Sequence, residues 1–155
     1  MQYEWINNDA KMSSDYTIIH FHDIFNQKIG QNTLPKNLTI LAFGDNFNQK
    51  IDSGILPENL TTLIFGRKFN HKLDANTLPN KLTTLTFGLY FNQGIDSGIL
   101  PENITTLTFG RKFNQKIDSN TLPDKLTTLN LEGFFDQKIE PNILPDKLTC
   151  LTFGW

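Results

Sequence analysis

The stretch FNQKIDSGILPENLTTLIFGRK, residues 47–68, decides the fold because its pattern returns along the chain at a constant interval of 22 residues. It contains a Phe-Asn pair at its start, a Leu-Pro pair in its middle and a Leu-x-x-Leu-x-Phe-Gly run near its end. A fixed period of about 20 to 29 residues is typical of a solenoid, in which coils stack along one axis. Each coil is too small to bury its own apolar side chains, so burial comes from its neighbours.

Three apolar columns follow from this period. They are Phe25, Phe47, Phe69, Phe91, Phe113 and Phe135; Leu41, Leu63, Leu85, Leu107, Leu129 and Leu151; and Phe43, Phe65, Phe87, Phe109, Leu131 and Phe153. Ile19 and Phe21 fit the second and third columns, which indicates a degenerate strand that begins near Tyr16. We therefore predict a repeat solenoid over residues 16–155, with one degenerate and about six full strands. Residues 1–15 are expected to form an N-terminal extension or cap.

Each coil is expected to contain one short strand. Residues 60–65, Leu-Thr-Thr-Leu-Ile-Phe, are rich in β-branched and aromatic side chains and end at Gly66, which predicts a strand followed by a turn. Stacked strands would form a parallel sheet with Leu63 and Phe65 pointing inward, and Leu60 inward through a bend. The apolar residues from Phe47 onward do not alternate, which indicates turns or a short helical turn. The predicted fold class is a leucine-rich-repeat-like solenoid.

Two polar columns are interpreted as structural. The asparagines from Asn26 to Asn114 are expected to bond the backbone of adjacent coils through their side-chain amides. The acidic column consists of Asp52, Asp74, Asp96, Asp118 and Glu140. Its carboxylates would lie roughly 5 Å apart, and lysines two residues earlier in most coils are expected to offset the repulsion. Aspartate before a small residue also suits a turn.

The words FNQKI and LPENLTTLIFG, with their copies over about residues 25–154, resemble the FNIP repeat family, known from social amoebae and giant viruses. The resemblance implies units related to leucine-rich repeats. Many members of that family carry an amino-terminal F-box that couples the repeats to a ubiquitin ligase. The resemblance therefore implies target recognition in a ubiquitin-ligase-type system. The fifteen residues before the first predicted strand are too few for an F-box, and we expect none in this chain.

The sequence offers no pattern for catalysis, and we expect neither an enzyme nor a cofactor. Cys150 and the histidines neither recur nor cluster as a nucleophile triad would require. His20 and His22 stand two residues apart on a predicted strand, but no third ligand follows at a suitable spacing, so no metal site is expected. The acidic column carries no copy distinguished from its neighbours, which argues against acid-base work.

Composition bounds the partners and the compartment. The net charge of −2 gives no overall basic field for nucleic acid or anionic membrane, so neither is expected as a partner. No window approaches the roughly 18 apolar residues of a membrane span. No basic-then-apolar secretory signal opens the sequence. The single cysteine fits a reducing compartment, so we expect a cytoplasmic protein, in the host cytoplasm if the protein is viral.

Functional residues are expected where the copies differ, on the outer face of the strands and in the turn after each strand. The predicted strand-face residues are Thr62, Ile64, Thr84, Thr86, Thr106, Thr108, Thr128 and Asn130. The predicted turn residues are Arg67, Lys68, Leu89, Tyr90, Arg111, Lys112 and Phe134. The two Arg-Lys pairs flank Leu89-Tyr90 and lie roughly 10 Å apart. Arginine and tyrosine are enriched at interface hot spots, so this patch is the candidate partner-binding surface, with a solvated edge as its alternative.

Three functions remain open on sequence alone. The leading hypothesis is a scaffold that binds a protein partner through these residues. The first alternative is self-association into a homo-oligomer, because the array stops at Trp155 just after a strand and an open strand edge invites pairing. The second is an ice-like surface binder that uses the outward threonine grid, although Ile64, Asn130 and the neighbouring arginines interrupt a regular lattice. Absence of thermal hysteresis would dispose of that alternative.

Overall fold

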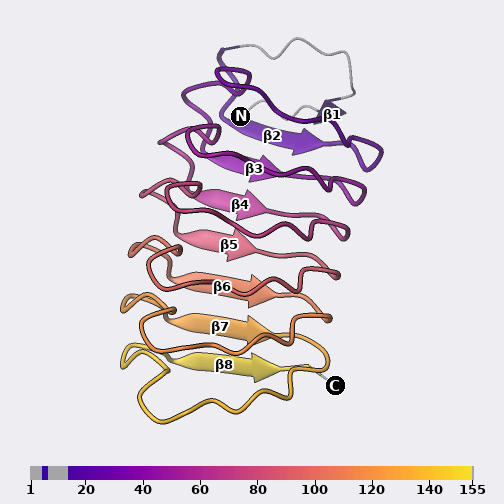
Figure 1. The fold of residues 1–155 in the computed structure, drawn as a ribbon. Helices are drawn as coiled ribbons and strands as arrows, with labels where there is room; N and C mark the ends of the chain where they lie inside the picture. Colours follow the sequence, from indigo (N-terminus) through magenta and orange to yellow (C-terminus); the bar gives the residue numbers. More distant parts are fainter. Residues whose placement is uncertain (1–4, 7–13, 155) are drawn as a thin grey trace.

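Eight short strands lie side by side in one parallel sheet, in the same order as in the sequence (Figure 1). This computed structural model describes residues 5–6 and 14–154. The strands are β1 (Trp5–Ile6), β2 (Ile18–Phe21), β3 (Ile40–Ala42), β4 (Thr62–Ile64), β5 (Thr84–Thr86), β6 (Thr106–Phe109), β7 (Thr128–Leu131) and β8 (Cys150–Phe153). From β2 onward each strand residue pairs with the residue one repeat later, as Leu63 does with Leu85. The predicted parallel solenoid is confirmed.

The remainder of each coil is built from turns, and the described residues contain no helix. Of the two forms expected for this segment, the chain therefore uses turns. The predicted degenerate strand is β2, whose Ile19 pairs with Leu41 in β3. β1 adds a further strand beside β2, with Trp5 opposite His20 in the ladder. Of the predicted extension or cap, residues 1–15, the structure describes only β1, Ser14 and Asp15.

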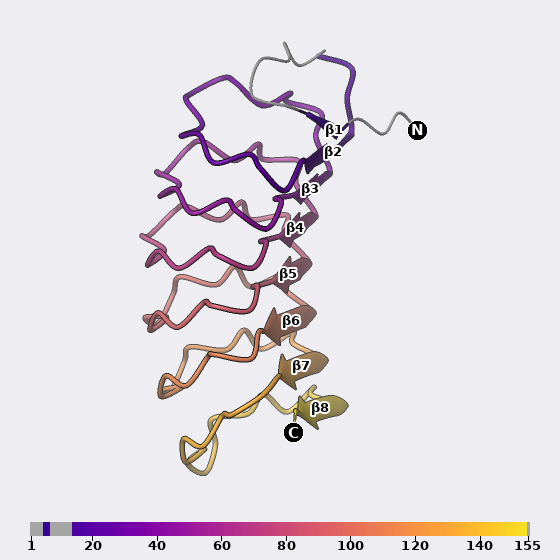
Figure 2. The same ribbon diagram turned by 90° about the vertical axis from the view of Figure 1, so that its right-hand side faces the viewer.

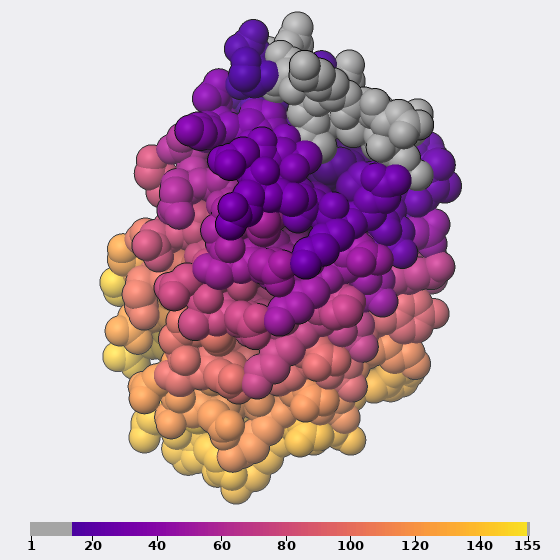
Figure 3. Space-filling view, turned by 45° about the horizontal axis from the view of Figure 1, so that its top comes forward, coloured from indigo at the N-terminus to yellow at the C-terminus, as the bar shows by residue number. Residues whose placement is uncertain are grey.

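The core behind the sheet combines buried leucine and isoleucine with two stacked phenylalanine columns. The side chains of Leu63, Phe65 and Phe69 are at most 2% exposed, and Leu60 is fully buried, as predicted. Within a coil the two rings stack closely, with 3.8 Å between the ring centroids of Phe65 and Phe69. Between coils most rings stack on their counterpart in the next coil, although Leu131 interrupts the column that contains Phe109. Because most rings contact rings of both neighbouring coils, the core is continuous along the stack, whose coils form successive bands in Figure 3.

The stack curves, with the strands on its inner side (Figure 2). Neighbouring strands in a sheet lie about 4.8 Å apart. Ring centroids are 5.4–5.6 Å apart in the column that begins with Phe21 and Phe43. They are 6.0–6.2 Å apart in the column that begins with Phe25 and Phe47. The coil spacing thus grows with distance from the sheet, which places the outward strand side chains on the concave face.

Side-chain hydrogen bonds tie each coil to the one before it. Asn26 Oδ1 accepts from the backbone N–H of Asn48 at 2.8 Å and from Gln49 Nε2 at 3.1 Å. The same pattern recurs at Asn70 and Asn92, which confirms the structural interpretation of the asparagine column. A second ladder was not predicted. It consists of threonine hydroxyls just before the strands that donate to the threonine carbonyl one coil earlier, at 2.9–3.3 Å.

The glycine in the turns after β3, β4, β5 and β6 has a steric reason, whereas His22 and Glu132 hold the equivalent position after β2 and β7. A Cβ at Gly66, Gly88 or Gly110 would overlap the backbone carbonyl of the equivalent glycine one coil earlier. The coils approach one another so closely here that only hydrogen fits. A different constraint acts in the Leu-Pro half of each coil, where one column has φ between 58° and 80° and holds Asn32, Gly54, Asn76, Gly98, Asn120 and Asn142. Asparagine and glycine are the residues that tolerate this left-handed region best.

Two buried threonine hydroxyls in the core lower the stability of the fold. Thr77 and Thr121 are 2% and 5% exposed, and their Oγ1 atoms have no hydrogen-bond partner. Ile55 and Ile99 hold the same position in alternate coils. An unpaired buried hydroxyl costs about 1 to 3 kcal/mol, so the core tolerates threonine there rather than gaining from it.

Candidate partner-binding surface

The two residues that precede the first phenylalanine of each coil form a continuous edge beside the sheet, which we call the turn ridge. In order along the stack it consists of Asp23-Ile24, Asp45-Asn46, Arg67-Lys68, Leu89-Tyr90, Arg111-Lys112 and Gly133-Phe134. All seven turn residues predicted from the sequence lie in it. The ridge begins where the strands end, at the same edge of each coil (Figure 1).

Backbone hydrogen bonds hold the ridge in register. Lys68 N–H donates to the carbonyl of Asp45 at 3.0 Å, Tyr90 to Arg67 at 2.9 Å and Lys112 to Leu89 at 3.0 Å. Phe134 N–H donates to the carbonyl of Arg111 at 3.4 Å. Each bond joins a turn to the turn one coil earlier, so the ladder of the sheet continues into the turns. The ridge side chains therefore project from a fixed backbone.

At the first turns of the ridge, the carboxylates of Asp23 and Asp45 each accept a hydrogen bond from the backbone of the next coil. Asp23 Oδ1 accepts from Asp45 N–H at 3.2 Å, and Asp45 Oδ1 accepts from Arg67 N–H at 3.3 Å. These bonds fix the positions of two negative charges beside the first basic pair. Asp23 and Ile24 were missed as ridge residues in the sequence. The signal was available, because they stand two periods before Arg67-Lys68.

The ridge exposes cations and aromatic rings together. Arg67, Lys68, Arg111 and Lys112 are all exposed. Tyr90 is 46% exposed and Phe134 is 71% exposed, although most phenylalanines of this chain are buried. Leu89 is half-buried. A shallow hollow of about 340 Å³ lies over the ridge, lined by Asp23, Asp45, Asn46, Arg67, Lys68 and Tyr90.

Five lysines in one column of the coils are paired, whereas Lys36, Lys81, Lys125 and Lys147 have no ion pair in residues 14–154. Lys28, Lys50 and Lys72 reach forward to Asp52, Asp74 and Asp96 of the following coil, with Nζ–Oδ2 distances of 2.6–2.8 Å. Lys116 and Lys138 instead pair within their own coils, with Asp118 and Glu140. The lysine two residues before the acid thus forms an ion pair with it in the last two coils, while in the earlier coils the pairing lysine comes from the preceding coil. Gly94 stands where the next forward-reaching lysine would be, so Asp118 receives none from the preceding coil.

These ion pairs lie at the surface, and they shift the pKa of some of their members. The hydrogen bond and charge of Lys28 lower the pKa of Asp52. The hydrogen bond and charge of Asp74 raise the pKa of Lys50. Exposed pairs of this kind contribute little to stability, so their main effect is to neutralise the acidic column. In residues 14–154, by contrast, no ion pair involves Arg67, Lys68, Arg111 or Lys112.

The predicted strand-face residues lie beside the ridge on the concave side, and all eight are half-buried. Thr84 pairs with Thr106 and Thr106 with Thr128 across the ladder, so the threonines stack in register. Asn130 Nδ2 donates to Thr108 Oγ1 at 3.0 Å. Trp155, predicted at the end of the array, lies outside the described residues.

The remaining candidates for chemistry are dispersed. His71 Nε2 lies 3.0 Å from the carbonyl of Asn48, which requires a proton on that nitrogen and gives the ring a structural role. Within the described part of the chain, no three His, Cys, Asp or Glu side chains gather as metal ligands would. In the same residues no helix has the length and apolarity to cross a bilayer.

Comparison with known proteins agrees with this geometry. The model of the FNIP Repeat family matches residues 25–68, 47–90, 69–112, 91–134 and 113–155. No curated protein matches the chain. Among solved structures, that of the giant-virus protein CroV588, described as a novel circular LRR protein structure, aligns with a TM-score of 0.87 and 50% sequence identity. The alignment covers 92% of this chain and 21% of the other, so this chain spans about one fifth of that protein's length. The family match covers most of the sequence, and the chain belongs to the FNIP repeat family.

Proposed function

We propose that the turn ridge and the adjoining strand face bind a protein, and that the chain works as a non-enzymatic scaffold. The observation that carries this proposal is the exposure of four cations without ion pairs beside Tyr90 and Phe134, on turns fixed by backbone hydrogen bonds. Exposed tyrosine and arginine supply large contact area with directed hydrogen bonds, which is the composition of interface hot spots. The rigid backbone keeps the ordering cost of binding low.

The family resemblance extends the proposal to target selection for a ubiquitin-ligase-type system in the cytoplasm, or in the host cytoplasm if the protein is viral. In that role the ridge would contact the target. The strand face would supply the polar rim, because threonine hydroxyls on a concave sheet present both donors and acceptors.

A triple alanine variant tests the surface. Changing Arg67, Tyr90 and Arg111 to alanine should reduce recovery of the specific partner from an amoebal lysate by about tenfold or more, because hot-spot residues dominate binding energy. Quantitative mass spectrometry of the bound fraction measures this recovery. The matched control changes three exposed residues away from the ridge, Lys36, Glu58 and Lys147, to alanine and should bind as the unchanged chain does.

Equal capture by the triple variant and the unchanged chain would refute the assignment of the binding surface to the ridge. Thermal unfolding of both variants must match that of the unchanged chain, since all six substituted side chains are exposed.

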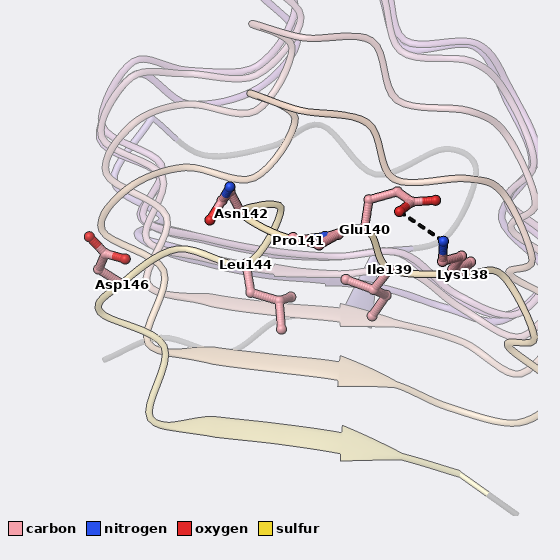
Figure 4. A pocket seen from close by; sticks show the side chains of 7 residues that line it. All are labelled: Lys138, Ile139, Glu140, Pro141, Asn142, Leu144 and Asp146. Atoms are coloured by element: carbon pink, nitrogen blue, oxygen red, sulfur yellow. Dashed lines mark ion pairs between the residues drawn. The ribbon is translucent and has the colours of Figure 1, made fainter.

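Self-association is the second candidate, and the geometry of the last coil favours it. Leu151 and Phe153 of β8 are 36% and 48% exposed, whereas their counterparts in the preceding strand are buried. A hollow of about 730 Å³ lies at the same coil, lined in part by Ile139 and Leu144, which point to the same side in Figure 4. A second copy that pairs with the edge of β8 would cover these apolar groups. Light scattering should then show a concentration-dependent dimer that Phe153→Lys abolishes; a monomer at high concentration would remove this candidate.

A further inference from the structure

We infer that the partner segment on the turn ridge is an extended peptide with a fixed order of charges. It carries one cation, then two acidic side chains three residues apart, then an apolar residue. This inference rests on the proposed protein-binding function and adds the chemistry of the partner. Its basis is the order of charges along the ridge together with the spacing of the coils.

The ridge changes sign once along its length. Its first two turns carry Asp23 and Asp45, whose carboxylates are fixed by hydrogen bonds to the backbone N–H groups of Asp45 and Arg67. The third and fifth turns carry the Arg-Lys pairs, with Tyr90 exposed between them, and the last described turn carries the exposed Phe134. The complementary partner therefore presents a positive, a negative, a second negative and an apolar group in that order.

The coil spacing matches the rise of an extended chain. Ridge backbones lie between the sheet, where the spacing is about 4.8 Å, and the phenylalanine column that starts at Phe25, where it is 6.0–6.2 Å. The two basic pairs stand two coils apart, which corresponds to about 10 to 12 Å. Three residues of polyproline II span about 9.3 Å and return to the same side of the chain. Acidic residues at positions i and i+3 thus reach both basic pairs, with the long arginine and lysine side chains absorbing the difference.

The exposed rings favour the same conformation. Polyproline II segments dock onto aromatic surfaces because their conformation is already ordered before binding. Tyr90 lies between the two basic pairs and lines the hollow over the ridge, so it is placed against the residues between the two acids. The ring of Phe134 stands one coil beyond Arg111-Lys112 and offers the contact for the terminal apolar residue.

The carboxylates distinguish a peptide from a polynucleotide. A nucleic acid strand has the same negative charge at every step, so its phosphates would face Asp23 and Asp45 as well as the arginines. The net charge of −2 also supplies no long-range attraction for a polyanion. Only a chain whose charge changes sign within a few residues suits both parts of the ridge.

The test uses a fluorescein-labelled peptide of sequence Lys-Pro-Glu-Pro-Pro-Glu-Pro-Phe. A second labelled peptide has the reversed sequence, because the order of charges does not say in which direction the partner chain runs along the ridge. Fluorescence polarisation with the complete protein measures Kd. We expect one of the two peptides to bind about tenfold or more tightly than the isomer in which its lysine and the neighbouring glutamate are exchanged. That isomer has the same composition and net charge, so the comparison isolates charge order.

Two charge-matched variants locate the contact. Arg67→Glu with Arg111→Glu should weaken binding of the ordered peptide by about tenfold or more. Lys36→Glu with Lys147→Glu makes the same change in net charge at exposed positions off the ridge and should leave Kd within about twofold. A peptide with every charge inverted should bind the Arg67→Glu, Arg111→Glu variant more tightly than it binds the unchanged chain.

Equal binding of the ordered peptide and its exchanged isomer would overturn the inference. Tighter binding of octathymidylate than of either peptide would also overturn it, in favour of a polyanion. These results are distinct from failure of the proposed function. If the triple alanine variant still loses its lysate partner, the ridge remains the binding surface and only the peptide chemistry is wrong.

Discussion

Phe91→Ala should lower the free energy of unfolding by about 4 kcal/mol, within the range of about 3 to 5 kcal/mol known for large aromatic truncations. Phe91 is fully buried in the middle of the stack. Its ring stacks at 3.8 Å on Phe87 within the coil, and at 6.1 Å and 6.2 Å on Phe69 and Phe113 of the neighbouring coils. Alanine would leave a cavity in the ring column. The coils on either side would then lose the ring contacts that Phe91 makes with Phe69 and Phe113.

Urea denaturation followed by circular dichroism measures this loss. The matched control is Thr86→Ser in β5, whose side chain is half-buried on the concave face, and the expected change is below about 0.5 kcal/mol. Equal losses in the two variants would show that the inward and outward assignments are wrong.

Gly88→Ala should destabilise the fold by about 3 kcal/mol, the upper end of the range of about 1 to 3 kcal/mol for steric overpacking, because the structure cannot relax locally. The added methyl group would overlap the carbonyl oxygen and carbon of Gly66, which are backbone atoms and cannot rotate away. Relief requires the two coils to separate at the turn. The hydrogen bond from Tyr90 N–H to the Arg67 carbonyl lies at this turn and would be lost with that movement.

Gly94→Ala is the matched control for this prediction. A Cβ at Gly94 meets nothing within 4 Å, and five other coils carry lysine at the equivalent position. We expect a change in unfolding free energy within about 0.5 kcal/mol, measured as for Phe91→Ala. Because both changes add one methyl group to a glycine, a difference between them reports contact between coils. Similar effects from the two would mean that the coils are not in close contact after the strands.

The sequence by itself determined the architecture of this protein. The period places each residue next to its counterpart one coil away, so the columns of leucine and phenylalanine define the inward face before any coordinates exist. The pairing of Leu63 with Leu85 and the stacking of Phe65 on Phe69 follow from that period and from the alternation of side chains along a strand. The asparagine ladder was predictable for the same reason, because a polar residue kept in a column has its own copies as neighbours.

Only the tertiary structure decided which charged residues are available to a partner. The sequence assigned Lys50 to the acidic column and Lys68 to the turn, but only the structure shows that Lys50 reaches the following coil and is neutralised by Asp74, whereas Lys68 has no ion pair in the described part of the chain. The close approach of coils at Gly88 and the left-handed backbone at Asn76 were likewise invisible as patterns of hydrophobicity. The physical reason is that periodicity fixes which residues are neighbours, while the curvature of the stack and the reach of each side chain fix which atoms meet.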